Sequence, residues 1–510
     1  MSDRSDREVE ERFHEEHPEA SMRRREFLTK TAALAGLGGL AAALPAKSLI
    51  SAAARAQARS SAMPSPRNMP IDTIVVLMME NRSYDHYFGW YAKGDGRNAG
   101  LSYPDDQGVM HPTHDLAPDF QGCGFDDPNH EWEGARIEYD NGALDGFYKA
   151  SDAYALGYYL EQDIPFLPKA ARNFTLYDRY FASLLGPTWP NRLYQHSAQS
   201  GGEKENASPQ DAANAYEAGG LYRWETIWDR LLQQGVDCRY YHSDLPFIGV
   251  FGKRFAGITR SVSEFYADAA AGQLPRVAFV DPPFLDGGGG RGLSGDEHPH
   301  GDIRIGQAFM SSIVHAFMAS PQYRRGALFV NYDEWGGFFD HVSPAFVPDD
   351  RSSLNLDDNF GITGFRIPGV VISPYARAGK VSHMQVTHES ILKLISYRFG
   401  LGHLNKRHRY ASNIGRSLNW DHPQFTPPEL PVVLPPAGVL ACDLQQSAGG
   451  SAAESKAYTR QEREEGLHIG DPIMIEYFQN LGYRAEPAKP DDLFTDPEAV
   501  RRLRRLWGSA

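Results

Sequence analysis

The apolar stretch Ile74-Val75-Val76-Leu77-Met78-Met79 is followed at once by the polar pair Glu80-Asn81. Uninterrupted, branched apolar runs of this length are typical of strands buried on both faces of a sheet. The chain has six short, mostly apolar runs that are typical of buried strands, with helical patterns between them. The runs are 74–79, 174–180, 238–241, 276–280, 327–332 and 369–373, and the helical patterns are 165–171, 190–197, 222–234, 303–319 and 387–399. This alternation predicts an α/β fold, an α/β/α sandwich with a mostly parallel central sheet.

The composition is that of a globular protein. Of 510 residues, 41% are apolar and 23% are charged, which excludes a polytopic membrane protein and a disordered chain. The 51 basic and 65 acidic residues give a net charge of −14, so a nucleic-acid binder is disfavoured. The three cysteines, Cys123, Cys238 and Cys442, are too few and too scattered for a disulfide framework or a cysteine zinc cluster. One bridge remains possible.

The N-terminal segment resembles a twin-arginine export signal. Arg23-Arg24-Arg25-Glu26-Phe27-Leu28 precedes a weakly apolar run at 31–44, and Ala54-Arg55-Ala56 offers a small-x-small cleavage pattern. The apolar run is shorter than the ~20 residues that span a bilayer, so no permanent membrane anchor is expected. The alternative is an amphipathic helix with a basic end. Because the arginine motif, the apolar run and the cleavage pattern occur in the order of an export signal, we expect residues 1–56 to be a signal peptide. We also expect the twin-arginine translocase to be a partner during export, and the protein to be periplasmic or secreted.

The rest of the chain divides by composition. Residues 57–69 form a linker, and residues 70–425 contain the strand and helix patterns given above, so we expect the main folded domain there. The segment TPPELPVVLPP, residues 426–436, is typical of an extended connector. We expect residues 426–510 to form this connector and a C-terminal helical extension that packs on the core.

Polar side chains follow four of the predicted strands. The carboxyl ends of parallel strands meet at one edge of a sheet, so these side chains should converge. They are Glu80-Asn81, His242, Asp281 and Asp333-Glu334. Clustered carboxylates repel one another unless a cation lies among them.

Glu80, Asn81, Asp333 and Glu334 offer hard oxygen ligands. The lack of cysteine ligands and of a histidine pair at ligand spacing favours Ca²⁺, Mg²⁺ or Mn²⁺ over structural zinc. An equally good interpretation is that these carboxylates cap helices or pair with arginines.

Thr188 lies between the run ending at 180 and the helical pattern beginning at Pro190. A hydroxyl there is near a helix N-terminus, where free N–H groups and the dipole favour an anion. The simpler interpretation is an N-cap threonine. Beside a metal, however, such a hydroxyl has the surroundings that a phosphoryl-accepting nucleophile requires.

Three histidines, His130, His242 and His298, lie in predicted loops rather than on apolar stripes. Each alone is more commonly a surface or hydrogen-bonding residue, because the chain has 18 histidines.

Several ordered motifs resemble those of the bacterial phosphoesterase family, which includes phospholipases C and certain acid phosphatases. The opening motif is Glu80-Asn81-Arg82-Ser83-Tyr84-Asp85-His86-Tyr87-Phe88-Gly89. It is followed by Asp178-Arg179-Tyr180-Phe181, Gly186-Pro187-Thr188-Trp189-Pro190-Asn191-Arg192, Glu297-His298-Pro299, Asp333-Glu334-Trp335-Gly336-Gly337-Phe338-Phe339-Asp340-His341-Val342 and Pro368-Gly369-Val370-Val371-Ile372-Ser373-Pro374. The similarity spans roughly Ile71 to Gly402.

The resemblance implies an alkaline-phosphatase-like core and specific roles for the matching residues. Glu80, Asn81, Asp333 and Glu334 match metal-site residues, and Thr188 matches a nucleophile that also touches the metal. His130 matches a general acid, whereas His242 and His298 match phosphate-contacting histidines. The implied cofactor is one divalent ion, with Ca, Mg or Mn favoured and Zn possible.

The implied activity is that of an exported phospholipase C, which hydrolyses phosphodiester bonds of phospholipids through a phosphothreonine intermediate. The alternatives are an acid phosphatase that cleaves small phosphomonoesters at the same site, and a non-catalytic exported protein that binds phosphate or phospholipid. If the head group is choline, five aromatic residues are candidates for a cation–π cage. They are Tyr84, Tyr158, Tyr159, Trp189 and Trp335.

Overall fold

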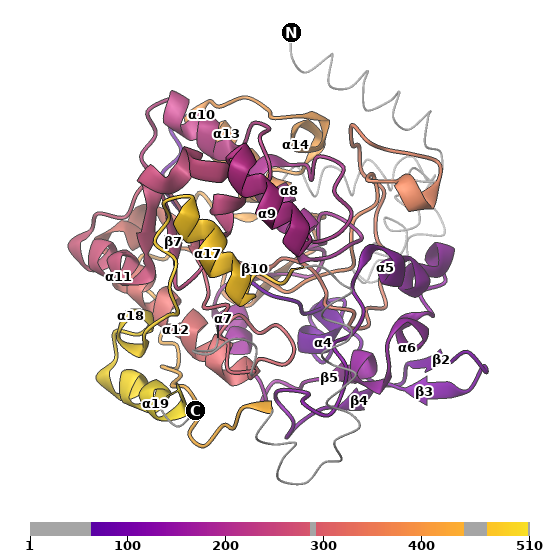
Figure 1. Ribbon diagram of the computed structural model, residues 1–510. Helices are drawn as coiled ribbons and strands as arrows, with labels where there is room; N and C mark the ends of the chain where they lie inside the picture. The colour runs from indigo at the N-terminus through magenta and orange to yellow at the C-terminus, as the bar shows by residue number, and fades with distance from the viewer. Residues whose placement is uncertain (1–62, 286–291, 443–466, 508–510) are drawn as a thin grey trace, which may run out of the picture.

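A central eight-stranded sheet organises the computed structural model, which describes residues 63–285, 292–442 and 467–507 (Figure 1). The strand order across the sheet is β12-β6-β11-β10-β1-β9-β7-β8. The strands are β1 (Thr73–Met79), β6 (Thr175–Tyr177), β7 (Cys238–His242), β8 (Thr259–Ser261), β9 (Val277–Asp281), β10 (Gly326–Tyr332), β11 (Gly369–Ile372) and β12 (Lys380–Ser382). The predicted signal, residues 1–56, lies outside the described residues.

Every strand pairing in this sheet is parallel except the two made by β11, with β10 and with β6. The chain between Tyr332 and Gly369 contains one short 3₁₀ helix, Leu356–Asp358, and no helix long enough to cross the sheet. A chain that returns from the same edge without a crossover must pair antiparallel. The exception at β11 follows from that connection.

Helices cover both faces of the sheet. In Figure 1, α8, α10 and α13 gather on one side, and α7, α11 and α12 on the other. Contacts of α8 with α10 and α13, and of α11 with α12, link each layer. The helices are α4 (Tyr84–Phe88), α5 (Trp132–Tyr139), α6 (Phe147–Ala150), α7 (Leu167–Asn173), α8 (Thr188–Ser197), α9 (Pro209–Ala218), α10 (Ile227–Gln233), α11 (Val262–Ala271), α12 (Ile303–Ala319), α13 (Glu389–Phe399), α14 (Lys406–Tyr410), α17 (Pro472–Asn480), α18 (Pro490–Leu493) and α19 (Pro497–Trp507). The predicted α/β/α sandwich with a mostly parallel sheet is confirmed.

The sequence predicted the interior of the sheet better than its margins. All six apolar runs form strands of the sheet, and all five helical patterns form helices. The strands that were not predicted, β8 and β12, have three residues each and include partly exposed polar side chains. Strands that short carry too little apolar periodicity to be distinguished from loops. Outside the sheet lie the small strands β2 (Ser102–Pro104), β3 (Met110–Pro112), β4 (His114–Asp115) and β5 (Gly157–Tyr158).

The C-terminal helices pack on the domain that carries the sheet. Helix α17 contacts α9, and α18 contacts α11. A disulfide between Cys123 and Cys442, with Cα atoms 5.3 Å apart, ties the connector to the loop before α5. It is the one bridge that the cysteine count allowed, and Cys238 is a buried free thiol in β7. Among the described residues, no helix is both long and apolar enough to span a membrane.

Candidate active site

Three carboxylates converge at the carboxyl edge of the sheet. The parallel register sets Met79 of β1 opposite Tyr332 of β10, so Glu80 and Asp333 leave the sheet side by side. Strand β9, on the other side of β1, ends at Asp281. All three carboxylates are buried. The predicted convergence of polar strand ends is therefore present in the structure.

The cation among these carboxylates is Arg192 of α8. Its guanidinium lies 3.0 Å from Glu80, 3.5 Å from Asp281 and 2.9 Å from Asp333. Burial alone would lower the pKa of Arg192, but the three carboxylates outweigh burial and raise it. We refer to these four residues as the Arg192 cluster. Glu80 and Asp333 thus follow the alternative interpretation, pairing with an arginine, and their proximity does not by itself require a metal ion.

Glu334 has no such cationic partner. Its Oε2 accepts the N–H of Gly336 at 2.5 Å, whereas its Oε1 is buried without a hydrogen bond. Among the described residues, its one ion-pair neighbour is His130, whose Nε2 lies 3.8 Å from Oε1. Burial, followed by the charge of Asp333, raises the pKa of Glu334 well above its ordinary value. Neutralising this carboxyl, by a proton or by a cation, would relieve the desolvation cost.

Asn81 links the strand ends to Thr188 and His130. Its backbone N–H donates to Asp333 Oδ1 at 3.2 Å, and its side-chain Oδ1 accepts the Thr188 hydroxyl at 3.3 Å. Its Nδ2 lies 3.2 Å from His130 Nε2. Asn81 has φ of 52°, in the left-handed region that asparagine tolerates better than most residues. A Cβ at Gly336 would lie 2.5 Å from the Asn81 carbonyl oxygen, so this glycine permits the two loops to meet.

Thr188 is the first residue of α8 rather than its N-cap, which is Pro187. Its hydroxyl turns toward Asn81, so the N-cap interpretation of this threonine is wrong. The helix end offers less to an anion than the sequence suggested. The Trp189 N–H donates to Asn206 Oδ1 at 2.9 Å, and Pro190 has no N–H. The backbone N–H of Thr188 is the donor that remains in this turn for an anion.

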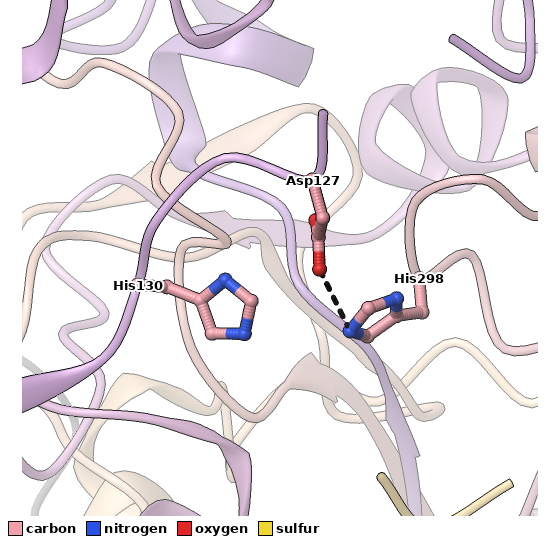
Figure 2. Close-up of side chains that lie close together, drawn as sticks. All are labelled: Asp127, His130 and His298. Carbon is pink, nitrogen blue, oxygen red and sulfur yellow. Dashed lines mark ion pairs between the residues drawn. The ribbon is translucent and has the colours of Figure 1, made fainter. Parts of the chain in front are cut away.

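His130, His298 and Asp127 form a second part of the site (Figure 2). Their ligand atoms lie within 4.8 Å of one another, and both imidazoles and the carboxylate point into the same space. His298 Nε2 is 3.6 Å from Asp127 Oδ2, and the two imidazole centroids are 5.8 Å apart. Burial lowers the pKa of His130 to about 4 and, with the neighbouring His468, holds the pKa of His298 well below its ordinary value. Both rings are neutral near pH 7.

The backbone fixes the tautomer of both neutral rings. His130 Nδ1 lies 2.7 Å from the carbonyl oxygen of Pro128, and His298 Nδ1 contacts the carbonyl oxygen of Pro299. Because a carbonyl only accepts, Nδ1 carries the hydrogen in each ring. The Nε2 atoms that face the site therefore carry a lone pair and no hydrogen. His130 Nε2 accepts a hydrogen bond from the side-chain amide of Asn81.

His242 lies at the same sheet edge but apart from the other two histidines. It ends β7 opposite Asp281 in the parallel register, and its Nδ1 donates to the Asp244 carbonyl at 3.2 Å. Burial lowers its pKa to about 4. Within the described residues, no hydrogen bond or ion pair joins His242 to Thr188, His130 or His298. The structure thus brings His130 and His298 together with Thr188 through Asn81. His242 lies at the end of β7, beyond β9 in the order of the sheet.

Four of the five aromatic residues suggested for a choline cage pack in the core. Tyr84, Tyr159, Trp189 and Trp335 are fully buried. The Trp335 indole donates to Glu138 at 2.7 Å, and the Tyr159 hydroxyl donates to the Asp119 carbonyl at 2.8 Å. These four rings therefore have structural partners, and a role in binding choline stays a prediction.

Arg192 and His468 are site residues that the sequence interpretation missed. Arg192 follows Thr188 by four residues, and i,i+4 spacing on α8 places both on one helix face. That spacing is a signal that could have been read. His468 reaches the site from the C-terminal extension, with its ring centroid 5.0 Å from that of His298. No local pattern in the sequence links it to the strand ends.

Comparisons with known proteins agree with the motifs. The model of the "Phosphoesterase family" matches residues 71–402. Phospholipase C B of Mycobacterium tuberculosis is 30% identical, covering 83% of this chain and 92% of its own length. Non-hemolytic phospholipase C of Pseudomonas aeruginosa is also 30% identical, over 71% of this chain and 59% of its own. A crystal structure titled as a protein in the alkaline phosphatase superfamily from Vibrio parahaemolyticus is 9% identical, with a TM-score of 0.31 over 66% of this chain and 68% of that chain. At that score, the structural likeness bears no argument about activity.

Proposed function

Because this chain belongs to the phosphoesterase family, and so is a hydrolase of phosphoester bonds, we propose that it is an exported phospholipase C with Thr188 as nucleophile. One observation carries the proposal. The Thr188 hydroxyl, the Asn81 amide, the His130 imidazole and the Glu334 carboxylate meet at the carboxyl edge of the sheet, where open α/β folds bind their ligands. The relatives named phospholipase C support the choice of a phosphodiester over other esters.

The donor set suits a hard divalent cation. Two buried carboxylate oxygens, Glu80 Oε1 and Glu334 Oε1, accept no hydrogen bond, and the neighbouring Asn81 and Thr188 add an amide and a hydroxyl oxygen. We propose that Glu80, Asn81, Thr188, Asp333 and Glu334 hold this ion, with Ca, Mg or Mn favoured. When bound, it would supply positive charge that favours the ionised hydroxyl and offsets charge on the phosphoryl group.

The protein's own residues position the reacting groups. Asn81 Oδ1 accepts a hydrogen bond from the Thr188 hydroxyl and so holds the hydroxyl oxygen in place for attack on phosphorus. Attack joins the Thr188 oxygen to phosphorus, breaks the bond from phosphorus to the alcohol oxygen and releases the hydroxyl proton to solvent. A water molecule then cleaves the phosphothreonine, which restores the Thr188 hydroxyl and releases the phosphorylated head group. We propose that His130 protonates the departing oxygen. Because its neutral ring presents a lone pair at Nε2, it must first take up a proton there, and Glu334 Oε1 at 3.8 Å would stabilise the imidazolium.

Export belongs to the same proposal. The Cys123–Cys442 disulfide supports it, because such bridges persist in the periplasm or outside the cell and are rare in the cytosol. The twin-arginine motif at Arg23-Arg24 gives a route by which a folded enzyme would leave.

Thr188→Ala tests the nucleophile. We expect kcat/KM for p-nitrophenyl phosphorylcholine to fall by about 10⁴-fold or more, as for other covalent nucleophiles, with an unchanged thermal midpoint. Thr188→Ser, which keeps the hydroxyl, is the matched control and should retain measurable turnover. Full activity in Thr188→Ala would contradict the assignment.

A substrate panel separates the alternatives. Phosphatidylcholine vesicles and p-nitrophenyl phosphorylcholine should be cleaved faster than p-nitrophenyl phosphate. The reverse order would identify an acid phosphatase. Binding without turnover of any ester, even with divalent ions added, would identify a non-catalytic binding protein.

A further inference from the structure

The C-terminal extension places one more imidazole at the active site. His468 lies between two buried apolar residues, Leu467 at 4% and Ile469 at 2% exposure, and is itself partly exposed. The Leu467 N–H donates to the Ala207 carbonyl at 2.8 Å, which fixes the segment to the chain that follows α8. The His468 N–H donates to Asp471 Oδ2 at 3.0 Å, just before α17 begins. His468 is therefore held in place by its own backbone and its neighbours.

Other residues of the extension also lie along the same edge. Arg484 and Glu486 are close enough to His242 to influence its pKa electrostatically, although burial has the larger effect. Helix α17 is attached to the core by the Tyr477 hydroxyl, which accepts the Leu221 N–H at 3.3 Å. The Tyr483 hydroxyl donates to the Gly252 carbonyl at 2.6 Å. The extension thus comes close to both His298 and His242.

The chemistry of the three neighbouring imidazoles differs. His130 and His298 each use Nδ1–H on a backbone carbonyl, so as neutral rings they turn lone pairs toward the site. Within the described residues, no hydrogen bond is made by the His468 ring. Its N–H is therefore available to an oxygen acceptor without any change of protonation. The His298 and His468 rings are in edge-to-face contact, with centroids 5.0 Å apart, so a phosphoryl oxygen bound beside this pair would be such an acceptor.

We propose that His468 is a substrate-binding residue that donates a hydrogen bond to a non-bridging phosphoryl oxygen. This inference rests on the proposed function and extends it, because it makes the C-terminal extension part of the substrate site. The shared chemistry is the phosphoryl group, whether in a lipid, a soluble ester or inorganic phosphate.

The test compares His468→Ala with wild type in the full-length protein. We expect the Kd for inorganic phosphate, measured by calorimetric titration, and the KM for p-nitrophenyl phosphorylcholine each to rise about tenfold, the effect of one hydrogen bond to a charged acceptor. The kcat and the thermal midpoint should stay near the wild-type values. His468→Gln, which keeps an N–H donor, should restore part of both affinities. Phosphatidylcholine vesicles in parallel show whether the lipid substrate follows the soluble ester.

His422→Ala is the matched control, because His422 is an exposed histidine outside the site. An unchanged phosphate Kd and KM in His468→Ala would overturn the proposal, as would a loss of kcat at constant KM. The phosphate titration needs no turnover. If wild type hydrolyses no ester, the proposed function fails, while a Kd that rises only in His468→Ala would still support this binding role.

Discussion

Two buried charge clusters, each built around an arginine, lie beyond the ends of the same two strands, β1 and β10. The Arg192 cluster contains Glu80, Asp281 and Asp333. The second, which we call the Arg366 cluster, contains Asp85, Asp340 and His341. Arg366 lies 3.1 Å from Asp85 and 2.9 Å from Asp340, and His341 is bound to Asp85.

The clusters differ in how completely their acceptors are used. In the Arg366 cluster, Nη1 of the arginine donates to the carbonyls of Asp95 and Asp178, and the His341 N–H donates to Asp85 Oδ2 at 2.9 Å. No side-chain oxygen of Asp85 or Asp340 is left without a hydrogen bond. At the other cluster, Glu80 Oε1 lies 3.0 Å from Arg192 but without hydrogen-bond geometry, and the adjacent Glu334 Oε1 also has none. The carboxylates of the Arg366 cluster are thus fully hydrogen-bonded, whereas two carboxylate oxygens at the Arg192 cluster and beside it are not.

Removing each arginine should give the largest effect. Arg192→Met and Arg366→Met each leave buried carboxylates unpaired, so we expect each to lose ~3–5 kcal/mol of unfolding free energy in urea titrations. Added divalent cation should restore part of the loss in Arg192→Met alone, since the orphaned oxygens lie there. If the methionine variants fail to fold, the same urea titrations are made on Arg192→Lys and Arg366→Lys, which keep the positive charge. If divalent cation restored the same unfolding free energy in both methionine variants, the two clusters would not differ in their capacity for a metal ion.

The Arg366 cluster should respond to alkaline pH through His341. Burial lowers the pKa of His341, but hydrogen bonds to Asp85 and Asp95 outweigh it and raise the pKa from 6.5 to about 9. A raised histidine pKa means that the stabilisation is complete below pH 6.5 and is lost as the pH rises through 9. We expect wild type to lose ~3 kcal/mol more than His341→Gln across that range, by the linkage of pKa to stability. Parallel pH profiles of unfolding free energy for the two proteins would contradict this.

The orphaned carboxylate at Glu334 gives the smallest expected effect. A divalent ion at 100 times its Kd should add ~2.7 kcal/mol to the stability of wild type. Glu334→Gln should abolish that gain, as seen in thermal melts with and without the ion. Glu138→Gln is the matched control, because Glu138 is a buried carboxyl near Glu334 whose partner is the Trp335 indole. A gain that persists in Glu334→Gln would exclude that carboxylate as a ligand.

The parts of the fold that were predictable are those in which local sequence and burial agree. Strands β1 and β10 are buried at every residue, so their uninterrupted apolar runs identified them. The antiparallel direction of β11 was not visible, because it depends on the path of the chain from Tyr332 to Gly369 rather than on the residues of the strand.

The site was predictable to the extent that it follows from strand ends. Glu80 and Asp333 meet because β1 and β10 are neighbours in register. The i,i+4 spacing of Thr188 and Arg192 could have placed this arginine on the site face of α8, but its pairing with Glu80, Asp281 and Asp333 depends on how α8 packs against the sheet. His468 was beyond reach, because its position depends on tertiary packing of a segment remote from the motifs. The roles of Thr188, His130, His242 and His298 remain predictions.

Strand β1 lies in the middle of the sheet, but its two neighbours come much later in the chain and are translated later. Strand β9 begins at Val277 and β10 at Gly326. At about 5–20 residues per second, synthesis of the chain from β1 to the start of β9 takes roughly 10–40 s. Throughout that interval the nascent segment Thr73–Met79 has no native partner for its backbone. The centre of the sheet therefore cannot assemble until the chain through Tyr332, about two thirds of the polypeptide, has been synthesised.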